Sequence, residues 1–124
     1  MNRQKSVFER YERRLKIYQH IVEMIRLVVR DFAPEIQDLL KFSADTAEAD
    51  FLFGEEIPKY INELFNHAMS LNIARHKYRD FTQPIPEGYD HQKVVDALMK
   101  EEKWFLDQLP IAKEKFKQYL DISQ

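Results

Sequence analysis

Apolar residues recur at alternating spacings of three and four along the first quarter of the chain. They are Phe8, Tyr11, Leu15, Tyr18, Val22, Ile25, Val29 and Phe32. A repeat sustained over more than three heptads predicts one continuous helix of about 28 residues, roughly 42 Å long. The sequence therefore favours a bundle of long helices.

The second half of this helix carries an additional apolar row, made of Ile17, Ile21, Met24 and Val28. One narrow stripe on the first half and a broad apolar arc on the second half need different surroundings. A broad arc requires several neighbouring helices to cover it. We therefore expect the second half to lie at the centre of the bundle.

Three further helices are predicted downstream. The second runs from residue 34 to about 50, with a break or bend near 44, and the third begins after Gly54. After a loop at residues 82–90, the fourth runs to about 121 with a kink at Pro110. Two glycines and five prolines in 124 residues leave room for few turns. The expected fold is all-α, one domain (1–124): an antiparallel four-helix bundle with three long helices and one short second helix.

Composition excludes several classes of protein. Cysteine is absent, which removes disulfides, thiolate metal sites and cysteine nucleophiles. No stretch reaches the roughly 20 apolar residues of a membrane span, and the first residues lack the apolar segment of a signal peptide. We therefore expect a cytoplasmic protein without a membrane span.

The segment "DFLFGEEIPKYINELF", residues 50–65, combines aromatic residues, a glycine and two adjacent glutamates. It predicts a packed corner in which Phe51 and Phe53 plug the end of the core. Glu55 and Glu56 would then face the positive end of the third helix. Adjacent glutamates on a helix point about 100° apart, which argues against a shared substrate.

No catalytic, metal-binding or cofactor-binding pattern is evident. No histidine follows a glutamate at the Glu-x-x-His spacing of di-iron bundles, and no Gly-x-Ser-x-Gly or phosphate-binding loop is present. His67 and Glu102 are expected to face each other between the third and fourth helices, as a polar pair in the core. We therefore expect no enzyme, metal or cofactor.

Two surfaces of the first helix are candidate binding sites. The narrow stripe of Phe8, Tyr11, Leu15 and Tyr18 suits a protein interface, unless the third and fourth helices cover it. Residues 1–16 also hold six basic side chains against two acidic ones, although the whole chain carries a net charge of −2. Nucleic acid or an anionic surface could therefore bind through Arg3, Arg10, Arg13, Arg14 and Lys16.

The segments "RRLKIYQHI", "DFLFGEEIPKYINELF" and "KWFLDQLPIAKEKFKQYL" together resemble a family of short, uncharacterised bacterial helical proteins. The matching residues are Leu15, Tyr18, Phe51 to Phe53, Tyr60, Trp104, Phe105, Phe116, Tyr119 and Leu120. This resemblance implies a helical fold and no catalytic residue.

The leading functional prediction is a non-enzymatic helical module that binds itself or another protein. The alternative is a binder of nucleic acid or an anionic surface, acting through the basic start of the first helix. Binding of the second kind would weaken steeply with salt.

Overall fold

The structure is a computed structural model that describes the backbone of residues 3–121 and the side chains from residue 5 onward. Across these residues it contains six helices and no strand, which confirms the all-helical prediction. The helices are α1 (Arg3–Asp31), α2 (Ile36–Asp45), α3 (Ala49–Leu52), α4 (Glu56–Lys77), α5 (His91–Leu106) and α6 (Gln108–Leu120).

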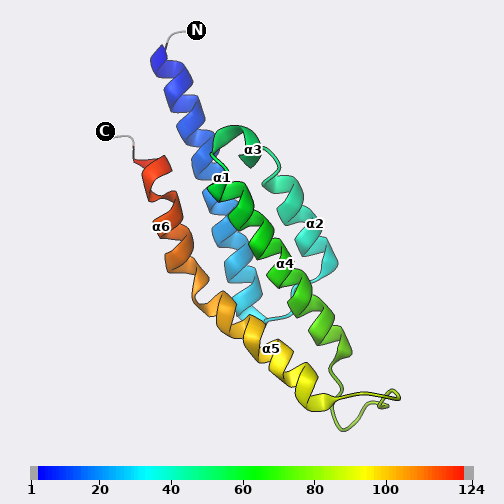
Figure 1. Cartoon of the computed structure of the whole chain (residues 1–124). Coiled ribbons are helices and arrows are strands. Elements are labelled where there is room, and N and C mark those ends of the chain that lie inside the picture. Colours follow the sequence, from blue (N-terminus) through cyan, green and yellow to red (C-terminus); the bar gives the residue numbers. More distant parts are fainter. Residues whose placement is uncertain (1–2, 122–124) are drawn as a thin grey trace.

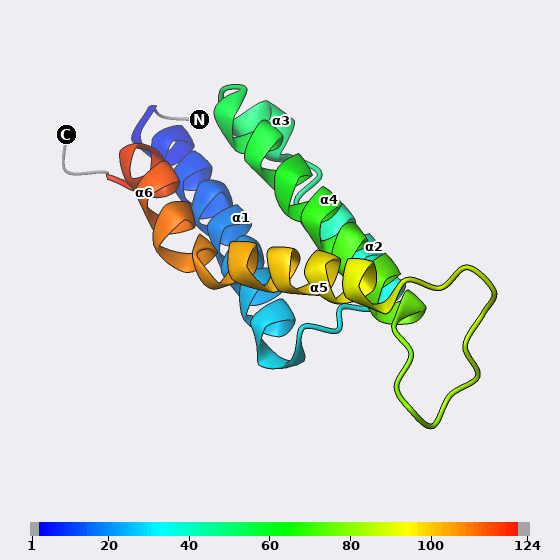
Figure 2. The same ribbon diagram turned by 60° about the horizontal axis from the view of Figure 1, so that its bottom comes forward.

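The helices pack side by side with two distinct ends (Figure 1). α1 begins and α6 ends at one end, hereafter the terminal end, where α3 also lies. Residues 78–90, which join α4 to α5, project from the opposite end, hereafter the loop end (Figure 2). α4 packs mainly against α5 and α2, and α1 against α6 and α2.

The second half of α1 is central, as its broad apolar arc predicts. α1 contacts α2, α3, α5 and α6. Its buried residues are Ile17, Ile21, Met24, Ile25 and Val28. Four of these five belong to the second apolar row. The heptad row is less buried than expected, because Val22, Val29 and Phe32 are only partly covered.

The second predicted helix is divided into α2 and α3, a few residues later than the expected break near 44. α2 begins at Ile36 after Pro34, and the Asp38 carboxylate accepts a hydrogen bond from the Glu35 backbone N–H at 2.9 Å. At the other end, the Thr46 hydroxyl donates to the carbonyl of Phe42 at 2.7 Å. The backbone N–H of Thr46 donates to the same carbonyl at 3.1 Å, and the chain turns between Thr46 and the start of α3.

The fourth predicted helix is also divided, and a continuous helix with a kink at Pro110 is wrong. α5 ends at Leu106, and α6 begins at Gln108. Pro110 has no N–H to donate to the Leu106 carbonyl, and its ring clashes with that carbonyl in a regular helix. The interruption therefore falls one turn before the proline, and Pro110 occupies the tolerated first turn of α6.

Candidate functional site

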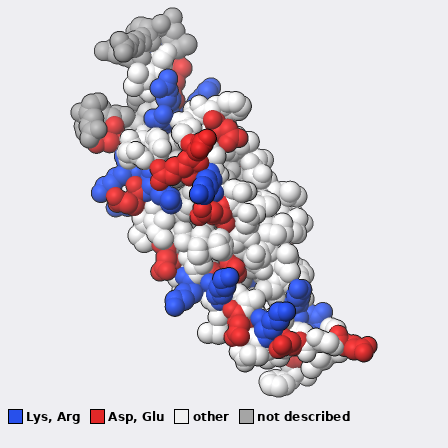
Figure 3. Space-filling view, viewed as in Figure 1, with Lys and Arg blue, Asp and Glu red and all other residues white. Residues whose placement is uncertain are grey.

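Several apolar side chains lie exposed or partly exposed on the outer side of α2 and α4. We call this surface the α2–α4 face and define it by Ile36 and Leu40 on α2 and Ile61, Phe65 and Met69 on α4. Leu40 is 62% exposed and Ile36 43% exposed, and the three α4 residues are partly exposed. The space-filling view shows this area as a broad white expanse between charged regions (Figure 3).

The α4 sequence explains why this face carries no charge. Ile61, Phe65 and Met69 follow one another at a spacing of four, which keeps them on one side of the helix. Between Pro58 and Ala74 the charged residues are Lys59 and Glu63, which lie outside that row. α2 runs antiparallel beside this row.

Two contacts fix the position of α2 along α4. The Asn72 side chain donates to the carbonyl of Pro34 at 2.9 Å, and Ser43 shares a shallow depression with Ile61 and Phe65. Because α2 runs antiparallel to α4, Ile36 and Leu40 lie nearer than Ser43 does to the Met69 end of α4. Apolar side chains on two neighbouring helices thus stay exposed or partly exposed, and exposed apolar patches mark interaction sites.

The predicted interface on α1 is only partly open. Phe8 is 56% exposed, while Tyr11, Leu15 and Tyr18 are partly buried. The Tyr18 ring packs against Phe116 of α6, with ring centroids 5.1 Å apart. α6 therefore covers the inner part of this stripe, and the accessible apolar part lies at its start.

The structure separates the predicted anion-binding residues into two groups. Arg10, Arg13 and Lys16 are exposed, whereas Arg14 is partly buried; the side chain of Arg3 lies outside the described residues. Arg14 Nε donates to the carbonyl of Leu52 at 2.8 Å.

The guanidinium of Arg14 also lies over two aromatic rings. Its central carbon is 5.5 Å from the Phe53 ring and 5.4 Å from the Tyr119 ring. Partial burial and the neighbouring charge of Arg10 lower the pKa of Arg14. Arg14 therefore joins α1, α3 and α6, and its contacts hold the bundle together.

The aromatic corner at residues 50–65 differs from the prediction in one residue. Phe53 is buried and packs edge-on against Phe116 and Tyr119, at 5.3 and 5.1 Å. Phe51 is 88% exposed, so its predicted role as a core plug is wrong. Leu52 is buried in its place. The one-turn helix α3 sets this orientation, because successive residues on a helix point about 100° apart.

His67 pairs with Glu101 instead of the predicted Glu102. The Nδ1 atom of His67 is within hydrogen-bond distance of the Glu101 carboxylate, which is nearly buried. Trp104 stacks on the imidazole, with ring centroids 3.7 Å apart. The sequence repeat missed Glu101 because it followed the three–four spacing through Glu102, one residue away. Within residues 3–121, no three histidine or carboxylate side chains gather closely enough to hold a metal ion.

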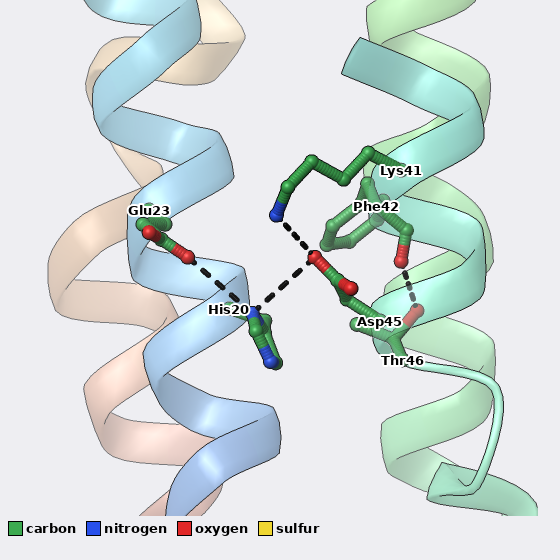
Figure 4. A network of polar contacts seen from close by, with 6 residues as sticks. All are labelled: His20, Glu23, Lys41, Phe42, Asp45 and Thr46. Carbon is green, nitrogen blue, oxygen red and sulfur yellow. Dashed lines mark hydrogen bonds and ion pairs between the residues drawn. The ribbon is translucent and has the colours of Figure 1, made fainter. Parts of the chain in front are cut away.

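A second polar network joins α1 to α2 (Figure 4). The Nδ1 atom of His20 lies 3.3 Å from the Glu23 carboxylate and 3.5 Å from the Asp45 carboxylate. Lys41 contacts Asp45 at 2.6 Å, and this hydrogen bond lowers the pKa of Asp45. The contact between His20 and Asp45 joins the two helices, whereas the other two contacts lie within α1 and within α2.

No family model, curated protein or solved structure compared with this chain matches it. The resemblance to short bacterial helical proteins stays a prediction. No helix within residues 3–121 combines the length and apolar character needed to span a bilayer.

Proposed function

We propose that this chain is a non-enzymatic helical module that associates with a second copy of itself through the α2–α4 face. The observation that carries the proposal is the exposure, on the neighbouring helices α2 and α4, of five apolar side chains: Ile36, Leu40, Ile61, Phe65 and Met69. Burying such a surface against a matching one removes apolar area from water.

The absence of charge on this face favours a second copy as the partner. A two-fold interface brings the same patch of each subunit together, so a charged patch would meet its own charge. The residues that define the α2–α4 face are all uncharged, and self-pairing costs no like-charge repulsion. In this proposal, α2 with α3 and α5 with α6 act as the bent members of an antiparallel four-helix bundle. Bacterial origin and a cytoplasmic location stay predictions.

The predicted α1 stripe is a second, smaller contact in this proposal. Phe8 is its most accessible member, and Tyr18 already packs on α6. Binding of nucleic acid is the less favoured alternative, because Arg14 is engaged by Leu52, Phe53 and Tyr119.

The test compares Leu40→Glu with Met99→Glu. Leu40 is 62% exposed on the α2–α4 face, and Met99 is 61% exposed on α5. Both variants place one carboxylate on an exposed helix surface, so neither should unfold the protein. Light scattering over a range of concentrations should give a dimer for the wild type and for Met99→Glu. Leu40→Glu should be a monomer, because dimerisation would bury two unpaired carboxylates.

A wild type that is a monomer at every concentration would overturn the proposal. A dimer that survives Leu40→Glu would remove the α2–α4 face as the interface. In that case the double variant Tyr11→Ala, Leu15→Ala tests the α1 stripe in the same measurement. Far-ultraviolet circular dichroism of each variant confirms that the helices are intact.

A further inference from the structure

A cavity lies at the loop end, away from the α2–α4 face. It has a volume of about 930 Å³ and lies between the last turns of α4, the first turns of α5 and the projecting loop. Its floor is apolar and is formed by Ile73, Ala74, Val94 and Ala97. A concave apolar floor of this size is typical of small-molecule sites.

Hydrogen bonds hold the loop wall of this cavity in place. The Tyr89 hydroxyl accepts a bond from the backbone N–H of Arg79 at 2.9 Å and lies 3.1 Å from His91. Gly88 has a φ of 79°, a conformation that favours glycine, and it turns the chain back toward α5. The wall is therefore a defined part of the fold.

Arg79 is engaged by the backbone and stabilises the end of α4. Its Nη1 atom donates to the carbonyls of His76, Lys77 and Tyr78, at 2.8, 3.2 and 3.0 Å. These are carbonyls that a helix terminus leaves without partners. The arginine thus shapes the cavity rim through Nη1, which carries two of the five N–H donors of a guanidinium.

Two lysines on the cavity wall remain available. Lys77 comes from the end of α4 and Lys93 from the start of α5, and both are exposed. Neither ammonium group forms a hydrogen bond or ion pair within the described part of the chain. The wall also carries two carboxylates. Asp90 accepts a hydrogen bond from the backbone N–H of Lys93, and Glu87 is exposed on the loop.

We propose that this cavity binds a small amphipathic anion, meaning one carboxylate or phosphate group on a short apolar body. The apolar body would lie on Val94, Ala97 and Ile73. The anionic group would lie between Lys77 and Lys93, which approach from two different helices. Apolar contact supplies the area buried, and the two ammonium groups select the sign of the charge.

The probes are octanoate, octyl phosphate, octanol and octylamine, each titrated into isotopically labelled full-length protein and followed by NMR. Octanoate and octyl phosphate should shift amide signals from residues 73–97, and their relative affinities identify the preferred anionic group. Octanol should bind more weakly, and octylamine more weakly still. Failure of both anions to shift these signals would overturn the proposal.

Paired variants separate the cavity from general surface charge. Lys77→Gln with Lys93→Gln should weaken binding of the anions by roughly five- to tenfold, because two exposed charge contacts are lost. The control, Lys59→Gln with Lys103→Gln, changes the net charge equally on exposed positions elsewhere and should bind as the wild type does. Equal weakening by both pairs would show non-specific attraction and overturn the site.

Ala97→Phe supplies an independent measurement, because it fills the apolar floor without changing the charge. It should abolish binding of all the octyl compounds. Unchanged binding by this variant would place the ligand outside the cavity. None of these outcomes depends on self-association through the α2–α4 face.

Discussion

The two ends of the bundle are closed in different ways. At the terminal end, Phe53, Phe116 and Tyr119 pack ring against ring, and Arg14 lies over two of these rings. At the loop end, the end of α4, the start of α5 and the projecting loop line a cavity of about 930 Å³. The first end is filled by side chains, whereas the second is walled by a loop that hydrogen bonds of Tyr89 and Arg79 hold in place.

Both ends use an arginine to bind backbone carbonyls, and the surroundings of the arginine differ. Arg14 bonds to Leu52 beside aromatic rings, whereas Arg79 bonds to its own helix end beside an open cavity. The filled end gains stability from apolar burial, which scales with the area removed from water. At the loop end the apolar residues that line the cavity stay accessible, and we therefore propose the ligand site there.

The largest expected effect comes from emptying the filled end. Phe116 is fully buried, and its ring contacts Tyr18 and Phe53. Phe116→Ala should lower the free energy of unfolding by about 3–5 kcal/mol. The variant no longer buries the aromatic ring away from water, and it leaves a cavity in the core. Urea unfolding followed by circular dichroism measures this change.

Val94→Ala at the loop end is the matched truncation. Val94 is only partly buried, so its loss should cost about 1 kcal/mol or less. If Phe116→Ala and Val94→Ala lowered the free energy of unfolding equally, the terminal end and the loop end would not differ in packing as described.

The helical fold was predictable because hydrophobic period is a local property. The three–four repeat from Phe8 to Phe32 predicted α1, and Gly54 marked the start of α4 within two residues. The hydrophobic period alone could not show which of the two apolar rows on α1 would be more buried, because both rows fit a helix. The row containing Ile17 and Ile21 is the more buried one, since it faces several helices at once.

The candidate sites were less predictable, because they depend on which helices lie side by side. Ile61, Phe65 and Met69 are visible in the sequence as a row with a spacing of four. Only packing shows that this row stays partly exposed beside Leu40. A one-residue difference also separates Glu101 from Glu102, and it decides which carboxylate meets His67.

A hydroxyl buried near the filled end should produce the next largest effect. Tyr60 is 2% exposed, and its hydroxyl donates to the Gln108 side chain at 2.8 Å. Tyr60→Phe leaves the Gln108 oxygen without this donor and should lower stability by about 1–3 kcal/mol at neutral pH. Urea unfolding at several pH values measures both this loss and its dependence on pH.

The pH dependence follows from the raised pKa of Tyr60, which burial and the charge of Glu63 produce. In the unfolded chain the phenol ionises near pH 10, below its folded pKa. Its contribution is therefore fully present below about pH 10 and is lost as the pH rises further. Tyr60→Phe should show a shallower alkaline decline than the wild type. Ile57→Val, a buried control with tyrosine intact, should keep the wild-type slope.

The smallest expected effect on stability comes from a comparison of Arg14, which contacts α3 and α6, with the exposed Arg13. Arg14→Lys keeps the charge but removes the Nε donor to Leu52 and the planar group over Phe53 and Tyr119, so it should cost about 1 kcal/mol. Arg13→Lys makes the same chemical change at the neighbouring exposed position and should leave unfolding unchanged. Equal stability of the two variants would mean that Arg14 does not hold the terminal end together. Arg14 would then be available for binding an anion, together with the other basic residues at the start of α1. Affinity for a short single-stranded oligonucleotide at low salt would decide between this role and a structural one.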